Sequence, residues 1–104
     1  MIITTGEIIP NKKIIQIVGI SRGSTVRARH IGNDIFAWFK NIIGGEIHEY
    51  TKLQAEAREQ AMQRMEEDAE RMGADAVINF RIHTSTIAQA ASEILVYGTA
   101  VKLG

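Results

Sequence analysis

The last predicted strand of this chain carries apolar side chains on both of its faces. Within Ser92–Lys102, the apolar residues alternate between Ile94, Val96 and Ala100 on one face and Leu95, Tyr97 and Val101 on the other. Successive side chains of a strand point to opposite faces of a sheet, so both faces need to be covered. A chain of 104 residues can form one core. The pattern therefore indicates a small α+β subunit whose second sheet face is covered by other copies of itself.

A long amphipathic helix is predicted from about Ile47 to Met72. Its apolar residues form one stripe at helical spacing, namely Ile47, Tyr50, Ala57, Ala61, Met65, Ala69 and Met72. Two i,i+4 pairs, Arg64–Asp68 and Glu67–Arg71, support its exposed side. Gly73 follows the last apolar position and is a natural residue to end the helix.

Two strands complete the second half of the chain. In Ala76 to Thr86, apolar residues alternate with polar ones, so Ala76, Ile78, Phe80 and Ile82 are predicted to share the core face. A short connection, Ile87 to Ala91, joins this strand to the last one. The two strands are therefore expected to pair as an antiparallel hairpin.

The first half of the chain is predicted to hold two strands and a short helix. Ile14 to Ile20 is a strand with apolar residues on both faces, both expected to be covered, and it can continue to Val26 with a bulge at a glycine. Ile2 to Thr5 is a short strand that could complete another subunit's sheet. Pro10-Asn11 reads as a turn, and Asp34 or Asn33 can cap a short helix that runs to about Ile43.

These elements predict a single domain over residues 1–104. Its fold class is α+β, a β-α-β-β two-layer subunit in which one long helix packs on an antiparallel sheet, with a short helix before it. Self-association into a ring is expected, because exposed apolar patches and unpaired strand edges favour contacts between copies. The alternative is a monomer whose N-terminal segment covers its own sheet.

The composition excludes several kinds of function. The chain has 12 basic and 12 acidic residues, so net charge favours neither nucleic acid nor acidic membranes as a partner. It has no cysteine, which excludes disulfides, thiolate catalysis and cysteine-ligated metals. Neither a secretory signal nor a membrane-spanning run is recognisable. The expected location is the cytoplasm.

The sequence resembles the YbjQ-like family. The resemblance is carried by Asp34-Ile35-Phe36, Asn41-Ile42-Ile43-Gly44-Gly45-Glu46, Tyr50-Thr51, Ala57-Arg58, Met65, Gly73-Ala74-Asp75-Ala76-Val77 and Glu93-Ile94-Leu95-Val96-Tyr97-Gly98-Thr99-Ala100-Val101. It implies a dodecin-like subunit with the last strand in the middle of the sheet, assembled into a homopentamer. The family also carries a heavy-metal-binding label. A metal ion is therefore a cofactor that is expected from the resemblance alone.

Metal-ligating residues are sparse. Heavy metals favour thiolates, which the chain lacks. Met62, Met65 and Met72 share a helix, but the last two lie on its apolar stripe and suit core packing better. The histidines are widely spaced, and His30 and His83 are the remaining candidate ligands. A site shared around a ring axis stays open.

Two groups of polar residues are candidates for a ligand site or a subunit interface. Arg58 is predicted to lie near the centre of the helical stripe, where it could pair with Glu46, Glu93 or a neighbour's carboxylate, or clamp an anion. On the outer face of the final hairpin, Asn79, Arg81 and His83 are expected to lie near Thr99, Tyr97 and Leu95, with Glu93 diagonal to His83.

Three function classes remain open. The first is a homo-oligomer that binds a small polar ligand or a metal ion between subunits. The second is an enzyme with a site between subunits that uses His83 or Glu93 as base. The third is an anion- or nucleic-acid-binding module that uses the basic run of Arg22, Arg27 and Arg29.

Overall fold

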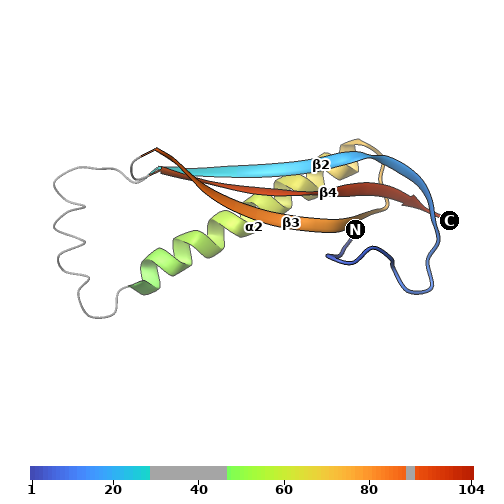
Figure 1. The fold of residues 1–104 in the computed structure, drawn as a ribbon, viewed down its shortest axis with the longest axis horizontal. Helices are drawn as coiled ribbons and strands as arrows, with labels where there is room; N and C mark the ends of the chain where they lie inside the picture. Colours follow the sequence, from blue (N-terminus) through green and yellow to red (C-terminus); the bar gives the residue numbers. More distant parts are fainter. Residues whose placement is uncertain (29–46, 89–90) are drawn as a thin grey trace.

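A computed structural model describes residues 1–28, 47–88 and 91–104, and it confirms the α+β fold class. The described elements are β1 (Ile2–Ile3), β2 (Ile14–Ala28), α2 (Ile47–Arg71), β3 (Ala76–Ala88) and β4 (Ala91–Leu103). The strands form one sheet in the order β1-β3-β4-β2, so the last strand of the chain lies inside the sheet (Figure 1). The predicted short helix, Asp34 to Ile43, lies outside the described residues.

Helix α2 covers one face of the sheet, and its alanines bring it close. Ala57, Ala61, Met65 and Ala69 are fully buried and recur every four residues. The helix ends as predicted, because Gly73 adopts a left-handed backbone with φ 78°. The Gly73 N–H donates to the Glu70 carbonyl and the Ala74 N–H to the Ala69 carbonyl, at 3.0 and 3.1 Å. These two bonds satisfy carbonyls that the helix end leaves free.

Strand β4 pairs with both of its neighbours in antiparallel register and supplies the centre of the core. Its residues Ile94, Val96 and Ala100 are buried against α2, as predicted. Leu95, Tyr97 and Val101 point to the opposite side, which we call the outer face. The two-faced pattern of the sequence is therefore confirmed.

A β-bulge in β3 overturns part of the predicted alternation. The register of β3 against β4 shifts between Ile78 and Arg81, and Asn79 has φ 53°. Because the bulge inserts an extra residue, the faces before and after it are exchanged. Ala76 and Ile78 consequently share the outer face with Arg81, and the prediction that they face the helix with Ile82 is wrong. Asn79 also loses its predicted place opposite Thr99, which pairs with Ile78.

The N-terminal segment covers one end of its own sheet. β1 pairs with β3 in parallel, so the prediction that it is free to complete another subunit's sheet is wrong for this arrangement. The Pro10-Asn11 turn is confirmed by the Lys12 N–H, which donates to the Ile9 carbonyl at 3.1 Å. Ile9 then packs on the outer face against Ala76, Ile78 and Val101. Val101 is fully buried and is thus shielded by its own chain.

Strand β2 touches the helix through a row of small residues. Gly23 faces α2, and a Cβ built on it would lie 2.3 Å from both the Ala61 carbonyl oxygen and the Met65 amide nitrogen. Ser21 and Thr25, on either side of it along the same face, are also buried. The helix backbone can therefore approach this strand only where a side chain is missing.

The other side of β2 is exposed. The strand is longer than predicted and shows the expected bulge near Gly19, since its register shifts between Ile17 and Gly19. On the outer face, Ile17, Ile20 and Val26 are 70%, 63% and 53% exposed. Ile15, which lies at a second register shift, is 60% exposed. A single chain therefore leaves this face of the strand uncovered, and its coverage by other copies stays a prediction.

Candidate functional site

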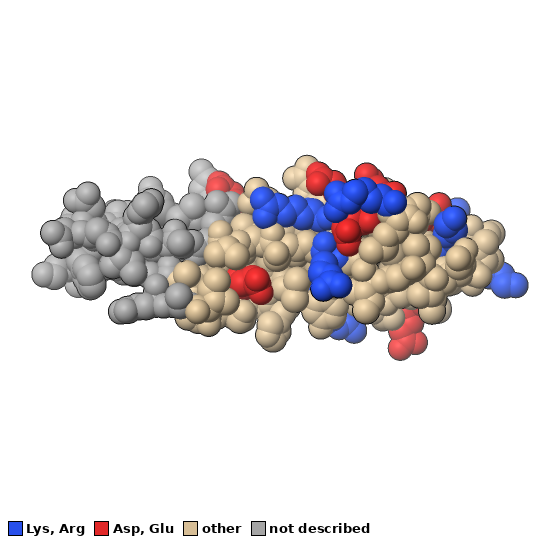
Figure 2. Space-filling model, turned by 90° about the horizontal axis from the view of Figure 1, so that it is seen from above, with Lys and Arg blue, Asp and Glu red and all other residues tan. Residues whose placement is uncertain are grey.

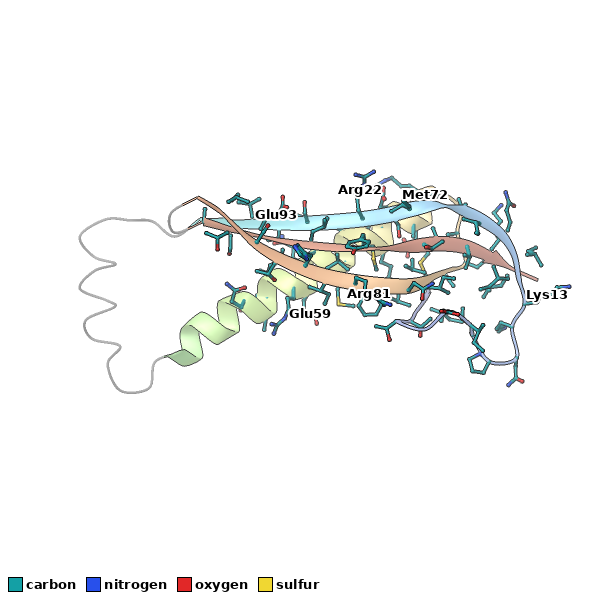
Figure 3. All side chains as sticks on the ribbon, viewed as in Figure 1. Lys13, Arg22, Glu59, Met72, Arg81 and Glu93 are labelled. Atoms are coloured by element: carbon teal, nitrogen blue, oxygen red, sulfur yellow. The ribbon has the colours of Figure 1, made fainter. Side chains whose placement is uncertain are left out.

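One row across the outer face brings Arg22, from the predicted basic run, next to residues of the final hairpin. Arg22 of β2 and Arg81 of β3 are both register partners of Tyr97 on the central strand β4. Directly opposed residues of neighbouring strands point to the same face. The row therefore reads Arg22, Tyr97, Arg81 across three strands, and we call it the Arg-Tyr-Arg row. Figure 3 shows the two arginines on the strands that flank β4.

Arg81 is held in place by two backbone carbonyls. Its Nη1 donates to the Phe80 carbonyl at 2.8 Å and to the Thr5 carbonyl at 3.2 Å. A guanidinium has five N–H donors, so the remaining nitrogens stay available. The N-terminal segment thus fixes one end of the row before any ligand arrives.

The row contains two positive charges that no described carboxylate neutralises by an ion pair. Within residues 1–28, 47–88 and 91–104, neither Arg22 nor Arg81 forms an ion pair. Glu93, four residues from Tyr97 along β4, lies about 13 Å away along the strand. The closer carboxylate is Asp68, which accepts the backbone N–H of Arg22 at 3.1 Å.

The next rows of the outer face hold the other hairpin candidates. His83 is opposite Leu95, and Glu93 is opposite Ser85, so Glu93 is diagonal to His83 as predicted. The His83 side chain is exposed and that of Glu93 is half-buried. The proposal that either acts as a catalytic base stays a prediction.

Arg58 lies apart from these residues. It is on α2, on the opposite side of the sheet, and its side chain is exposed. The prediction that it lies near the centre of the apolar stripe is therefore wrong in the single chain. No carboxylate of the described residues pairs with it.

The remaining candidates cannot be placed. Glu46, Arg29 and His30 lie outside the described residues. The backbone of Arg27 belongs to β2, where it is the register partner of Ser92, but its side chain also lies outside the description.

Helix α2 protects part of the free edge of β2. Arg64 donates from Nη1 to the Ser24 carbonyl at 2.6 Å, and Asp68 accepts the Arg22 N–H. Asp68 also pairs with Arg71 at 3.2 Å, which replaces the predicted i,i+4 pairs Arg64–Asp68 and Glu67–Arg71. Side chains that bind edge groups in this way oppose strand addition by another chain.

We expect the variant Asp68→Ala to expose the Arg22 amide, because it removes the acceptor that holds that N–H. Hydrogen exchange at Arg22 should become faster, and the free energy of unfolding should fall by about 1 kcal/mol. The control is Glu67→Ala, whose exposed side chain makes no such bond in the described part of the chain. Unchanged exchange at Arg22 would contradict this protection of the edge.

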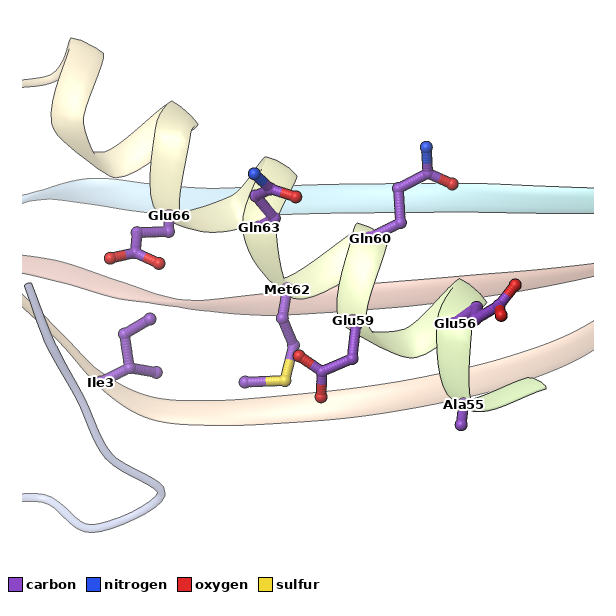
Figure 4. Close-up of a pocket in the computed structure, with 8 residues that line it drawn as sticks. All are labelled: Ile3, Ala55, Glu56, Glu59, Gln60, Met62, Gln63 and Glu66. Carbon is purple, nitrogen blue, oxygen red and sulfur yellow. The ribbon is translucent and has the colours of Figure 1, made fainter. Parts of the chain in front are cut away.

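A shallow groove runs along α2, away from the outer face. It has a volume of 840 Å³ and is lined by Ile3, Ala55, Glu56, Glu59, Gln60, Met62, Gln63 and Glu66 (Figure 4). Three glutamates make it acidic. Across the described ranges, however, no three His, Asp or Glu residues come close enough to hold a metal ion.

The described residues do not fit a heavy-metal ion. Such ions prefer thiolates, and the sequence has none. Met65 is fully buried in the core, while Met62 and Met72 are partly buried against it. A metal held jointly by several copies stays a prediction.

Comparison with known proteins identifies the family. A family model described as "Putative heavy-metal-binding" matches residues 1–104. The chain belongs to the YbjQ family. A UPF0145 protein of Hahella chejuensis is 54% identical over 103 residues, with 99% of each chain covered. A UPF0145 protein of Methanosarcina acetivorans is 52% identical, with 99% of this chain and 97% of the relative covered.

A solved structure supports the fold of this YbjQ family member. It is a crystal structure of a protein of unknown function from Pediococcus pentosaceus that belongs to the DUF74 family. The TM-score is 0.68 at 16% identity, over 100% of this chain and 98% of that one. At this identity the likeness concerns the fold alone.

The Arg-Tyr-Arg row was not recognised from the sequence. Arg81 and Tyr97 were expected to be neighbours, because a short hairpin fixes their register. Arg22 was assigned to a separate basic run, because a long connection separates β2 from β4. The one available signal was the alternation of β2, which places Ile20, Arg22, Ser24 and Val26 on a single face.

Proposed function

We propose that the protein functions as a homo-oligomer that holds a small polar ligand between its subunits. The observation that carries this proposal is the exposed apolar strip of β2, which consists of Ile15, Ile17, Ile20 and Val26. At least half of each side chain is in contact with solvent in the single chain. Arg22 and Ser24 separate Val26 from the three isoleucines. Exposed apolar surface of this kind usually marks an interface.

The exposed strip continues toward the Arg-Tyr-Arg row. Ile17, Ile20 and Val26 are register partners of Val101, Thr99 and Glu93, so they share the outer face with Tyr97. Tyr97 is 39% exposed. Seen from the β2 side in Figure 2, most of the described surface is uncharged. Charged groups of both signs are densest along one side, and single ones lie across the rest of it. A second copy that covers this strip would also enclose Tyr97 and its two arginines.

The subunit number is taken from the family resemblance. It implies a homopentamer of dodecin-like subunits, and the order β1-β3-β4-β2 supports the comparison, because β4 is inside the sheet.

Among the described residues, no helix is long and apolar enough to cross a membrane. We propose a cytoplasmic protein on this basis and on the lack of cysteine.

Replacing apolar residues of the strip should break the assembly. We expect the double variant Ile17→Glu, Ile20→Glu to run as a monomer at micromolar concentration, because two carboxylates cannot be buried in an apolar interface. Size-exclusion chromatography with light scattering measures this, and native mass spectrometry gives the subunit number of the unmodified protein. The control is Glu67→Lys, an exposed charge change on α2. A wild-type monomer at the same concentration would refute the proposal.

A further inference from the structure

We infer that the Arg-Tyr-Arg row binds a small ligand that carries an oxyanion, such as a phosphate, on an apolar ring. This inference rests on the proposed function, because it names the ligand class of the same face. Arg22 and Arg81 lie on either side of Tyr97 with their Cα atoms about 10 Å apart, the width of two strand spacings.

The two positive charges of the row favour an anion as the ligand. The two guanidiniums are on one face, and the described residues pair neither with a carboxylate. If a second copy covers the exposed strip, both charges lose solvent. Burying an unpaired charge is strongly unfavourable unless a counter-charge accompanies it. The apolar strip beside the arginines consists of isoleucines and a valine, so it supplies no counter-charge to the arginines of its own chain.

The geometry of Arg81 suits an oxyanion. Its Nη1 is already used by the Phe80 and Thr5 carbonyls, so the guanidinium plane is oriented in advance. The Nε and Nη2 side of the fork remains free to donate two parallel hydrogen bonds to one phosphate or carboxylate. Less side-chain entropy is then lost when a ligand binds.

Tyr97 supplies the apolar part of the site. Tyr97 is 39% exposed and lies between the two arginines, and half-buried Leu95 lies two residues away on the same strand and face. An aromatic ligand can stack on such a ring, which adds to the area that it buries. The phenol hydroxyl is a further hydrogen-bond donor.

The test uses the full-length protein and two probes, inorganic phosphate and phenyl phosphate, in calorimetric titrations. We expect phenyl phosphate to bind more tightly than inorganic phosphate. Arg22→Gln and Arg81→Gln should each weaken binding of phenyl phosphate by about tenfold to a hundredfold, because each removes charge-assisted hydrogen bonds. Tyr97→Ala should abolish the preference for phenyl phosphate over phosphate.

The matched control is Arg58→Gln, which removes an exposed arginine on the opposite side of the sheet and should leave binding unchanged. Arg81→Gln also removes the bond to the Thr5 carbonyl and could loosen the N-terminal segment. Arg22→Gln is the safer variant, since only the backbone of Arg22 binds Asp68.

The outcomes separate this inference from the proposed function. An oligomer that binds neither probe at millimolar concentration overturns the ligand site and leaves the assembly standing. Equal losses in Arg22→Gln and Arg58→Gln would also overturn the site, because binding would then follow net charge alone. A monomer that binds phenyl phosphate through Arg22 would refute the assembly and support the site.

Discussion

Replacing Gly23 with alanine should destabilise the protein by about 3 kcal/mol, the upper part of the range for overpacked cores. The added Cβ would meet two backbone atoms of α2 at 2.3 Å and the Cβ of Arg64 at 2.7 Å. Backbone atoms of a helix cannot rotate away as a side-chain end can. The helix must therefore move off β2 as a unit, which would loosen the contacts of Met65 as well. Urea unfolding at fixed protein concentration measures the loss.

The control for this prediction is Gly6→Ala. A Cβ at Gly6 would lie 3.5 Å from the nearest atom, the hydroxyl oxygen of Thr4, which is an ordinary contact distance. We expect a change below about 0.5 kcal/mol, typical of surface substitutions. Equal stability of Gly23→Ala and the wild type would mean that the helix does not touch β2 at this point.

Replacing Met65 with alanine should destabilise the protein by about 3 kcal/mol, within the range measured for buried methionines. Met65 is among the largest fully buried side chains, and it belongs to the core cluster that α2 forms with residues of β3 and β4. The loss combines the transfer of apolar atoms to water with the cavity that remains. The measurement is again the free energy of unfolding in urea.

Met72→Ala provides the comparison for Met65→Ala. Its side chain is only half-buried near the end of the helix, where its sulfur contacts the position of Gly19. We expect this variant to lose less than half as much stability. A larger loss for Met72 than for Met65 would contradict the described core.

Local patterns in the sequence predicted most of the secondary structure. The alanine and methionine spacing predicted α2, and Gly73 predicted its end, because both depend on neighbours within one or two turns. The alternation of β4 predicted its two faces for the same reason. The β3–β4 register near Tyr97 also followed from the short hairpin.

Two local predictions failed for identifiable reasons. The bulge at Asn79 exchanged the faces of β3, and a single left-handed asparagine gives little warning in the sequence. The predicted position of Arg58 depends on the average direction of the apolar stripe, with 100° of rotation per residue. The buried residues of α2 instead recur every four positions, so their line turns around the helix by about 40° at each step. At residue 58 the line of buried residues therefore points away from the average direction of the stripe, and Arg58 is exposed.

The sequence by itself determined the types of the described elements, the end of α2 and the presence of two apolar faces on β4, because these features depend on residues close together in the chain. Only the tertiary structure decided which faces are covered. Ile9 shields Val101 but leaves Tyr97 and Ile20 exposed, and Arg22 joins Arg81 across β4. These outcomes depend on contacts between distant segments, whose alignment is set by the fit of Gly23 against α2 and by the bulges in β2 and β3.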